Sequence, residues 1–146
     1  MFAKKILLLV IAIGIVPALR ADNTCTAATI KGAYGFSGTG LDMVHGSGSQ
    51  SSRQAFAPVT FLGTLSFTGD GMLSGSFTAN GNGHQESAAP LTGAYVVNAD
   101  CTGSIVVAEN DGHESHFAMT IADAGKEVLA IQTDAGLART FTVKKQ

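Results

Sequence analysis

The most informative pattern in this chain is a strict alternation of apolar and polar residues in short runs. In the clearest run, every second residue from Ala57 to Phe67 is apolar or glycine, and a shorter run surrounds Tyr34 and Phe36. The same alternation recurs at Leu73–Ala79, Leu91–Val97, Ile105–Val107, Phe117–Ile121, Leu129–Ile131 and Phe141–Val143. Because such alternation is typical of strands with one buried face, the sequence predicts eight strands, each about seven residues long.

Turn residues occupy every gap between these runs except the first. The predicted turns are Thr68–Gly71, Asn80–Gly83, Asn98–Cys101, Asn110–Gly112, Asp123–Gly125 and Asp134–Gly136. Glycine, asparagine and aspartate tolerate the positive φ angles that tight hairpins require. The gaps are too short for the crossovers that parallel strands need, so we expect an antiparallel up-and-down meander.

The first connection is different, because residues 43–54 are polar and rich in glycine and serine. We expect a flexible loop there, over one end of the domain. Eight short strands with one apolar face can close into a barrel, which removes exposed sheet edges. The predicted fold is therefore all-β, an eight-stranded barrel. A two-sheet sandwich uses the same strand patterns and is the alternative.

The beginning of the chain has the features of an export signal. Two lysines precede the apolar stretch Ile6–Val16, and Pro17, Ala18 and Ala21 follow it as helix-ending or small residues. A spanning helix needs about 20 apolar residues, and this stretch is about half that length. We expect residues 1–21 to be a signal peptide and residues 22–146 to form one domain with no integral membrane segment.

Charge and cysteine content limit the cellular compartments in which the protein is expected and the classes of partner that it can bind. Residues 22–146 contain 6 basic and 11 acidic residues, a net charge of −5, and their only basic pair is Lys144–Lys145. This composition argues against nucleic-acid partners, which are bound through clustered basic side chains. The two cysteines, Cys25 and Cys101, are predicted to form a disulfide in a secreted or periplasmic protein.

A search for catalytic or metal chemistry identifies no complete motif. The sequence His113-Glu-Ser-His116 is one residue shorter than the zinc-protease signature. On a strand, residues 113 and 116 point to opposite faces and cannot bind one ion together. The sequence also has no nucleophile elbow, phosphate-binding loop or dinucleotide fingerprint. We therefore predict no catalytic residue, no metal site and no cofactor, and leave enzymatic activity open.

One charged residue is out of place in the alternation. Arg139 shares strand parity with Phe141 and Val143 and should face the apolar side. A buried guanidinium needs a partner, and Glu109 is the expected acid and Tyr34 the expected aromatic neighbour. Arg139 then either closes one end of the barrel or anchors an anionic ligand group.

Two sets of residues resemble known proteins. Gly32-Ala-Tyr34 with Arg139 resembles the calycin arrangement, in which a basic side chain from the last strand covers an aromatic of the first. The chain has no tryptophan and no second lipocalin motif, so the resemblance is partial. Gly63–Gly71 and Gly93–Gly103 are similar to motifs of uncharacterised small secreted bacterial proteins, some of which look like allene-oxide-cyclase barrels. The resemblance implies a fold and brings no catalytic residue.

Three functions are compatible with this sequence. The first is a secreted barrel that binds a small apolar or amphipathic ligand, a hydrophobic acid among the candidates, through Tyr34, Tyr95, Glu109 and Arg139. The second is a structural or interaction protein of the envelope or extracellular space that has no pocket. The third is a barrel enzyme of isomerase type. The oligomeric state is left open.

Overall fold

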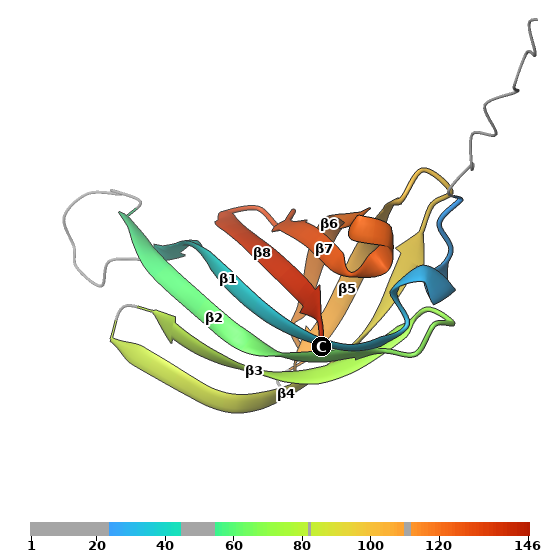
Figure 1. The fold of residues 1–146 in the computed structure, drawn as a ribbon. Coiled ribbons are helices and arrows are strands. Elements are labelled where there is room, and N and C mark those ends of the chain that lie inside the picture. Colours follow the sequence, from blue (N-terminus) through green and yellow to red (C-terminus); the bar gives the residue numbers. More distant parts are fainter. Residues whose placement is uncertain (1–23, 45–54, 82, 110–111) are drawn as a thin grey trace, which may run out of the picture.

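The computed structural model describes residues 24–44, 55–81, 83–109 and 112–146, and these form a closed barrel (Figure 1). The strands are β1 (Gly32–Val44), β2 (Ala55–Phe67), β3 (Met72–Gly81), β4 (His84–Val97), β5 (Thr102–Glu109), β6 (Glu114–Ala122), β7 (Glu127–Gln132) and β8 (Leu137–Lys145). Each strand pairs antiparallel with the next, and β1 pairs with β8. The predicted meander and barrel are confirmed, and the sandwich is excluded.

Strand lengths differ from the prediction. They range from 6 residues in β7 to 14 in β4, against about seven predicted for each. Because β1 continues to Val44, residues 43 and 44 belong to a strand and not to the predicted loop. The remainder of that loop and the predicted signal peptide lie outside the described residues. No helix in the described part of the chain is long and apolar enough to span a membrane.

Two hairpins, β1–β2 and β3–β4, extend beyond the rest of the barrel (left side of Figure 1). The pairing of β2 with β3 begins at Val59, and the pairing of β4 with β5 begins at Leu91. Pro58 and Pro90 each lie one residue beyond these limits. Since proline has no backbone N–H to donate, it is tolerated where a strand has no hydrogen-bonding neighbour on one side.

The opposite end of the barrel is plugged by a short 3-10 helix, η1 (Ala27–Ile30). Ile30 and Tyr34 have no exposed surface, and Val128 and Phe67 are equally well buried. The rings of Tyr34 and Phe67 pack edge to face, with centroids 5.2 Å apart. These side chains belong to one continuous cluster of buried residues.

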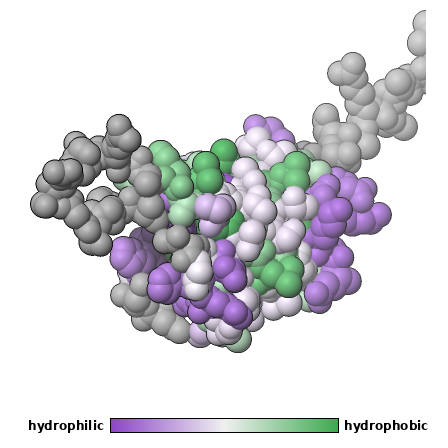
Figure 2. Space-filling view, turned by 90° about the vertical axis from the view of Figure 1, so that its left-hand side faces the viewer, coloured by the Kyte–Doolittle hydropathy of each residue, from purple (hydrophilic) through white to green (hydrophobic). Residues whose placement is uncertain are grey.

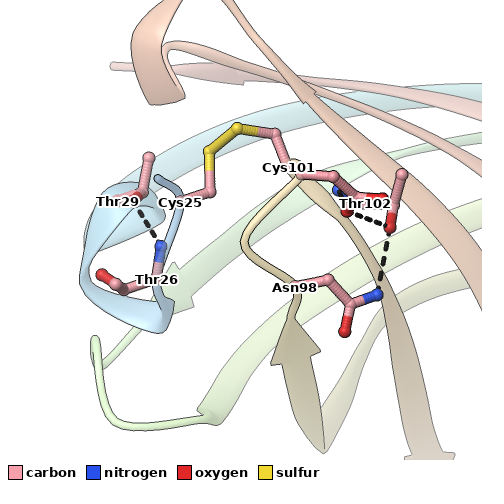
Figure 3. Close-up of a disulfide and its surroundings, with 7 residues drawn as sticks. Cys25, Thr26, Thr29, Asn98, Cys101 and Thr102 are labelled. Atoms are coloured by element: carbon pink, nitrogen blue, oxygen red, sulfur yellow. Dashed lines mark hydrogen bonds between the residues drawn. A yellow bond between two sulfur atoms is a disulfide. The ribbon is translucent and has the colours of Figure 1, made fainter. Parts of the chain in front are cut away.

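The disulfide between Cys25 and Cys101 holds this plug in place (Figure 3). It joins the segment before η1 to the turn between β4 and β5, across a sequence separation of 76 residues. The backbone N–H of Cys25 also donates to the carbonyl of Ala99 at 3.2 Å. The predicted disulfide is therefore confirmed, and it fixes the N-terminal part of the domain to the barrel.

Candidate functional site

The barrel interior next to this plugged core contains a cavity of about 80 Å³. Its wall is formed mainly by apolar side chains from the inner face, five of them phenylalanines: Phe36, Phe61, Phe77, Phe117 and Phe141. Among the described residues that line it, Ser115 and Arg139 are polar. An apolar cavity with a few polar groups is the usual composition of a small-molecule site, although typical sites begin at about 300 Å³.

The cavity is small because phenylalanine rings fill the spaces beside inward glycines. A Cβ atom placed on Gly38 would be 2.3 Å from the ring of Phe141, and one on Gly63 would be 2.6 Å from the ring of Phe36. The Phe141 ring also lies 5.4 Å from that of Phe117. These inward glycines thus allow close ring packing, which leaves only part of the interior free.

The cavity is partly open to solvent. Phe61, Phe117 and Phe141 point inward but are only partly buried, in contrast to the fully buried rings at the plugged end. The free energy of the system falls when another apolar group covers inward-facing apolar surface of this kind and removes it from water. This end is accordingly the part of the interior that a small molecule can reach.

Arg139 lies on the cavity wall, and its charge is paired with Asp42. Its Nε and Nη2 atoms donate to the two carboxylate oxygens of Asp42, each at 2.6 Å, in a bidentate contact. The side chains are 17% and 28% exposed, so the pair is mostly buried. The guanidinium carbon also lies 4.9 Å from the ring centroid of Phe61. A Cβ atom on Gly40, opposite Arg139 in the β1–β8 register, would be 2.6 Å from the Arg139 Cγ atom.

These contacts bear on two expectations about Arg139. Its observed acid partner is Asp42, whereas the expected partner Glu109 has a side chain outside the described part of the structure and stays a prediction. Tyr34 is approached by Lys145, with Nζ 5.7 Å from the ring centroid, and not by Arg139. The reason is register, since Lys145 pairs directly with Tyr34 across β1 and β8. The basic residue that covers Tyr34 is therefore Lys145, and not the Arg139 expected from the resemblance to calycins.

Tyr34 and Tyr95 lie at the plugged end and do not line the cavity. The Tyr34 hydroxyl donates to the carbonyl of Gly125 at 2.5 Å, and the Tyr95 hydroxyl donates to that of Ala27 at 3.1 Å. Burial, and to a lesser extent the neighbouring Tyr95, raises the pKa of Tyr34. Both hydroxyls connect the barrel wall to the 3-10 turns, and ligand contact by either residue stays a prediction.

A buried polar residue next to the cavity was not identified from the sequence. Gln132, the last residue of β7, is 4% exposed and faces inward with Val128 and Ala130. The sequence pattern had assigned the inward face to Leu129 and Ile131, but these are 46% and 52% exposed. That assignment was wrong, because the larger aliphatic residues of β7 lie on the outside and the smaller ones face the crowded interior.

The amide of Gln132 belongs to a hydrogen-bond network. Its Nε2 donates to Asp134 Oδ2 at 2.8 Å and to Ser115 Oγ at 3.3 Å. Asp134 also accepts from the backbone N–H of His116 at 2.9 Å. The Gln132 amide and then the His116 N–H lower the pKa of Asp134 to about 2. Among the described residues, Gln132 Oε1 has no hydrogen-bond partner.

The outer wall of the barrel offers a shallower feature. A hollow of about 340 Å³ lies over β6, β7 and β8, between threonines and the exposed Leu129 and Ile131. On the face shown in Figure 2, hydrophobic residues form separate patches among weakly polar and hydrophilic ones. Across the described residues, no three His, Cys, Asp or Glu side chains are grouped closely enough to hold a metal ion.

Comparison with known proteins indicates the fold and no family. No family model matches the sequence, and a search of curated proteins found no match. Among solved structures, a de novo designed fluorescence-activating β-barrel is similar, with a TM-score of 0.52 and 13% identity. The match covers 84% of this chain and 99% of the designed one. At that identity, the likeness shows a shared barrel architecture alone.

Proposed function

We propose that this protein binds a small, mainly apolar molecule, one end of which enters the cavity beside Arg139. The observation that carries the proposal is the partial exposure of the inward-facing rings of Phe61, Phe117 and Phe141 around that cavity. A ligand that covers these rings is stabilised by the apolar surface that both partners remove from water.

The volume limits what the cavity takes. An apolar cavity of about 150 Å³ can bind benzene, and a water molecule has a share of about 30 Å³ in the liquid. The 80 Å³ found here suits a short alkyl end or a five-membered ring. A longer ligand extends from the cavity toward the open end of the barrel.

The charged side chains at the site, Arg139 and Asp42, determine which charge the head group of the ligand can carry. A hydrophobic acid was the expectation for an unpaired Arg139, but Asp42 already neutralises this side chain in a bidentate contact. A ligand carboxylate would have to separate that pair or approach Asp42 unpaired. The pair therefore favours a neutral ligand over an acid.

Two further observations support the proposal. The designed barrel of similar fold is named as fluorescence-activating, a property of that protein, and the shared architecture is compatible with a small-ligand function here. The Cys25–Cys101 disulfide is consistent with an oxidising compartment, in agreement with the proposed export signal in residues 1–21. We infer that the ligand is met outside the cytosol.

A series of 1-alkanols from ethanol to octanol tests the proposal. Each added methylene that enters the cavity contributes about 0.8 kcal/mol, so affinity should rise about fourfold per carbon until the cavity is full and then level off. The measurement is a titration followed by NMR, with resonances of Phe61, Phe117 and Phe141 as reporters. Affinities that do not depend on chain length, or shifts confined to outer-surface residues, would contradict the proposal.

A matched pair of variants distinguishes ligand binding in the cavity from binding at the outer wall of the barrel. Ala130 lines the cavity and also borders the outer hollow, whereas Ala118, on the outside of the neighbouring strand β6, borders the hollow and not the cavity. The substitution Ala130→Leu should fill the cavity and weaken alkanol binding at least tenfold, while Ala118→Leu should leave it unchanged. If Ala118→Leu alone weakens binding, the protein acts through its outer surface, as in the pocketless alternative.

A further inference from the structure

We propose that the side-chain carbonyl of Gln132 is the polar anchor of this site and selects neutral ligands that carry a hydroxyl or N–H group. This inference rests on the proposed function and names the chemical class of its ligand. Gln132 is 96% buried, since 4% of its surface is exposed, and among the described residues its Oε1 atom accepts no hydrogen bond. A buried carbonyl without a donor is unfavourable, so a ligand that supplies one is favoured.

Gln132 does not itself line the cavity, but it lies beside residues that do. It follows Ala130 on the inner face of β7 and pairs directly with Phe117 of β6. Its amide nitrogen is hydrogen-bonded to Ser115, which is two residues before Phe117 on the same strand. Ala130, Phe117 and Ser115 all line the cavity, so the amide is bordered by cavity residues along its own strand and across β6.

The orientation of the amide is fixed by its neighbour Asp134. The pKa of Asp134 is held at about 2, so at neutral pH its carboxylate is ionised and accepts hydrogen bonds only. The NH₂ group of Gln132 must therefore face Asp134, at 2.8 Å, and the carbonyl oxygen must face away from it. A flipped amide would place two acceptors in contact, which excludes the alternative orientation.

The charges around the cavity determine the class of donor. A carboxylate ligand has no proton to give to Gln132 Oε1 and meets Arg139 already neutralised by Asp42. An ammonium ligand has protons to give but loses its hydration among phenylalanine rings, and the described residues of the cavity wall offer it no acidic side chain. A neutral alcohol, amide or ring N–H supplies the donor without either cost.

Pyrrole and furan provide a direct test on the full-length mature chain. The two rings have the same size and shape, but pyrrole presents an N–H donor where furan presents an oxygen. Because one additional hydrogen bond is worth about 1 kcal/mol net, pyrrole should bind about five- to tenfold more tightly than furan. Propionate, the acidic probe, should bind more weakly than pyrrole. Affinities are measured by NMR titration of the labelled protein.

The outcomes distinguish this inference from the proposed function. If none of the probes or alkanols shifts the cavity resonances, the proposed function fails. If pyrrole and furan bind equally, or propionate binds most tightly, ligand binding stands and the role of Gln132 is overturned.

Substitution of Gln132 then tests the residue itself. In Gln132→Leu the preference for pyrrole over furan should disappear while furan still binds, and in the matched surface control Gln85→Leu it should persist. Gln132→Met serves as a second variant of similar length if the leucine variant does not fold. A pyrrole preference that survives the loss of the carbonyl contradicts the inference.

Discussion

Residue by residue, the interior of this barrel is determined by where glycines stand opposite large side chains. Phe141 packs into the space beside Gly38, and Arg139 crosses β1 beside Gly40 to reach Asp42. Each of these contacts joins β1 to β8, which are far apart in sequence and adjacent in the closed barrel. The side chains that surround the candidate site therefore depend on closure, and their partners follow from the register of two strands.

The substitution Asp42→Asn should destabilise the protein by removing the partner of Arg139. Hydrogen bonds to charged groups contribute about 1.5–3 kcal/mol, and because the pair retains some exposure we expect a loss of about 1–2 kcal/mol. The measurement is the free energy of unfolding from urea denaturation. A double-mutant cycle with Arg139→Gln should show that the second change adds little once Asp42 is replaced.

The control for this prediction is the ion pair between Lys144 and Glu127. Its atoms are 3.5 Å apart and the Lys144 side chain is 72% exposed, so Lys144→Gln should change stability by less than about 0.5 kcal/mol. Equal effects of Asp42→Asn and Lys144→Gln would show that Arg139 does not depend on its buried partner.

At the level of strands and turns, the local sequence predicted an element well where a residue type is required by one backbone conformation, as glycine is in tight turns. The turn at Thr68–Gly71 was predictable because it contains two glycines, and in the structure these adopt φ angles of +91° and +106°. Such angles favour glycine over other residues. Strand β7 was harder, because Leu129 and Ile131 alternate as clearly as Val128 and Ala130. Which of the two sets faces inward depends on the space left by β6 and β8, so the local sequence of β7 does not predict its inward face.

The plug and its disulfide form an element whose contribution can be measured. Under the chain-entropy model, a crosslink that spans 76 residues stabilises the fold by about 4.5 kcal/mol, and measured values for disulfides are typically about 2–4 kcal/mol. The double substitution Cys25→Ser and Cys101→Ser should lower the free energy of unfolding by roughly that amount. Calorimetry and urea denaturation provide the measurement.

The same variant tests the position of the cavity. Alkanol affinity should remain within about twofold at temperatures where the variant is folded, because the disulfide lies at the plugged end and neither cysteine lines the cavity. A large loss of affinity in folded protein would show that the plug shapes the binding site.

For the molecule as a whole, the sequence was sufficient for the architecture and insufficient for the site. Eight alternating runs and short turns restrict the chain to a meander, and closure follows because it removes both edges. The site depends on pairs such as Arg139 and Asp42, 97 residues apart, which only the assembled register defines. The inward orientation of Arg139 was predictable from parity, whereas its partner and the role of Gln132 were not.

The two projecting hairpins lead to a prediction about solubility. Pro58 and Pro90 are exposed and stand where β2 and β4 pass beyond their described pairing with β3 and β5, so neither strand presents a backbone N–H at that point. Proline at such edges prevents strand addition by another chain. The double substitution Pro58→Thr and Pro90→Thr should therefore increase concentration-dependent self-association, measured by sedimentation velocity, while the free energy of unfolding changes by less than about 1 kcal/mol. Ser66→Thr, at a position of β2 that pairs with both neighbours, is the matched control and should remain unaffected. If the double variant has the same sedimentation profile as the parent at every concentration, these edges are protected by something other than proline.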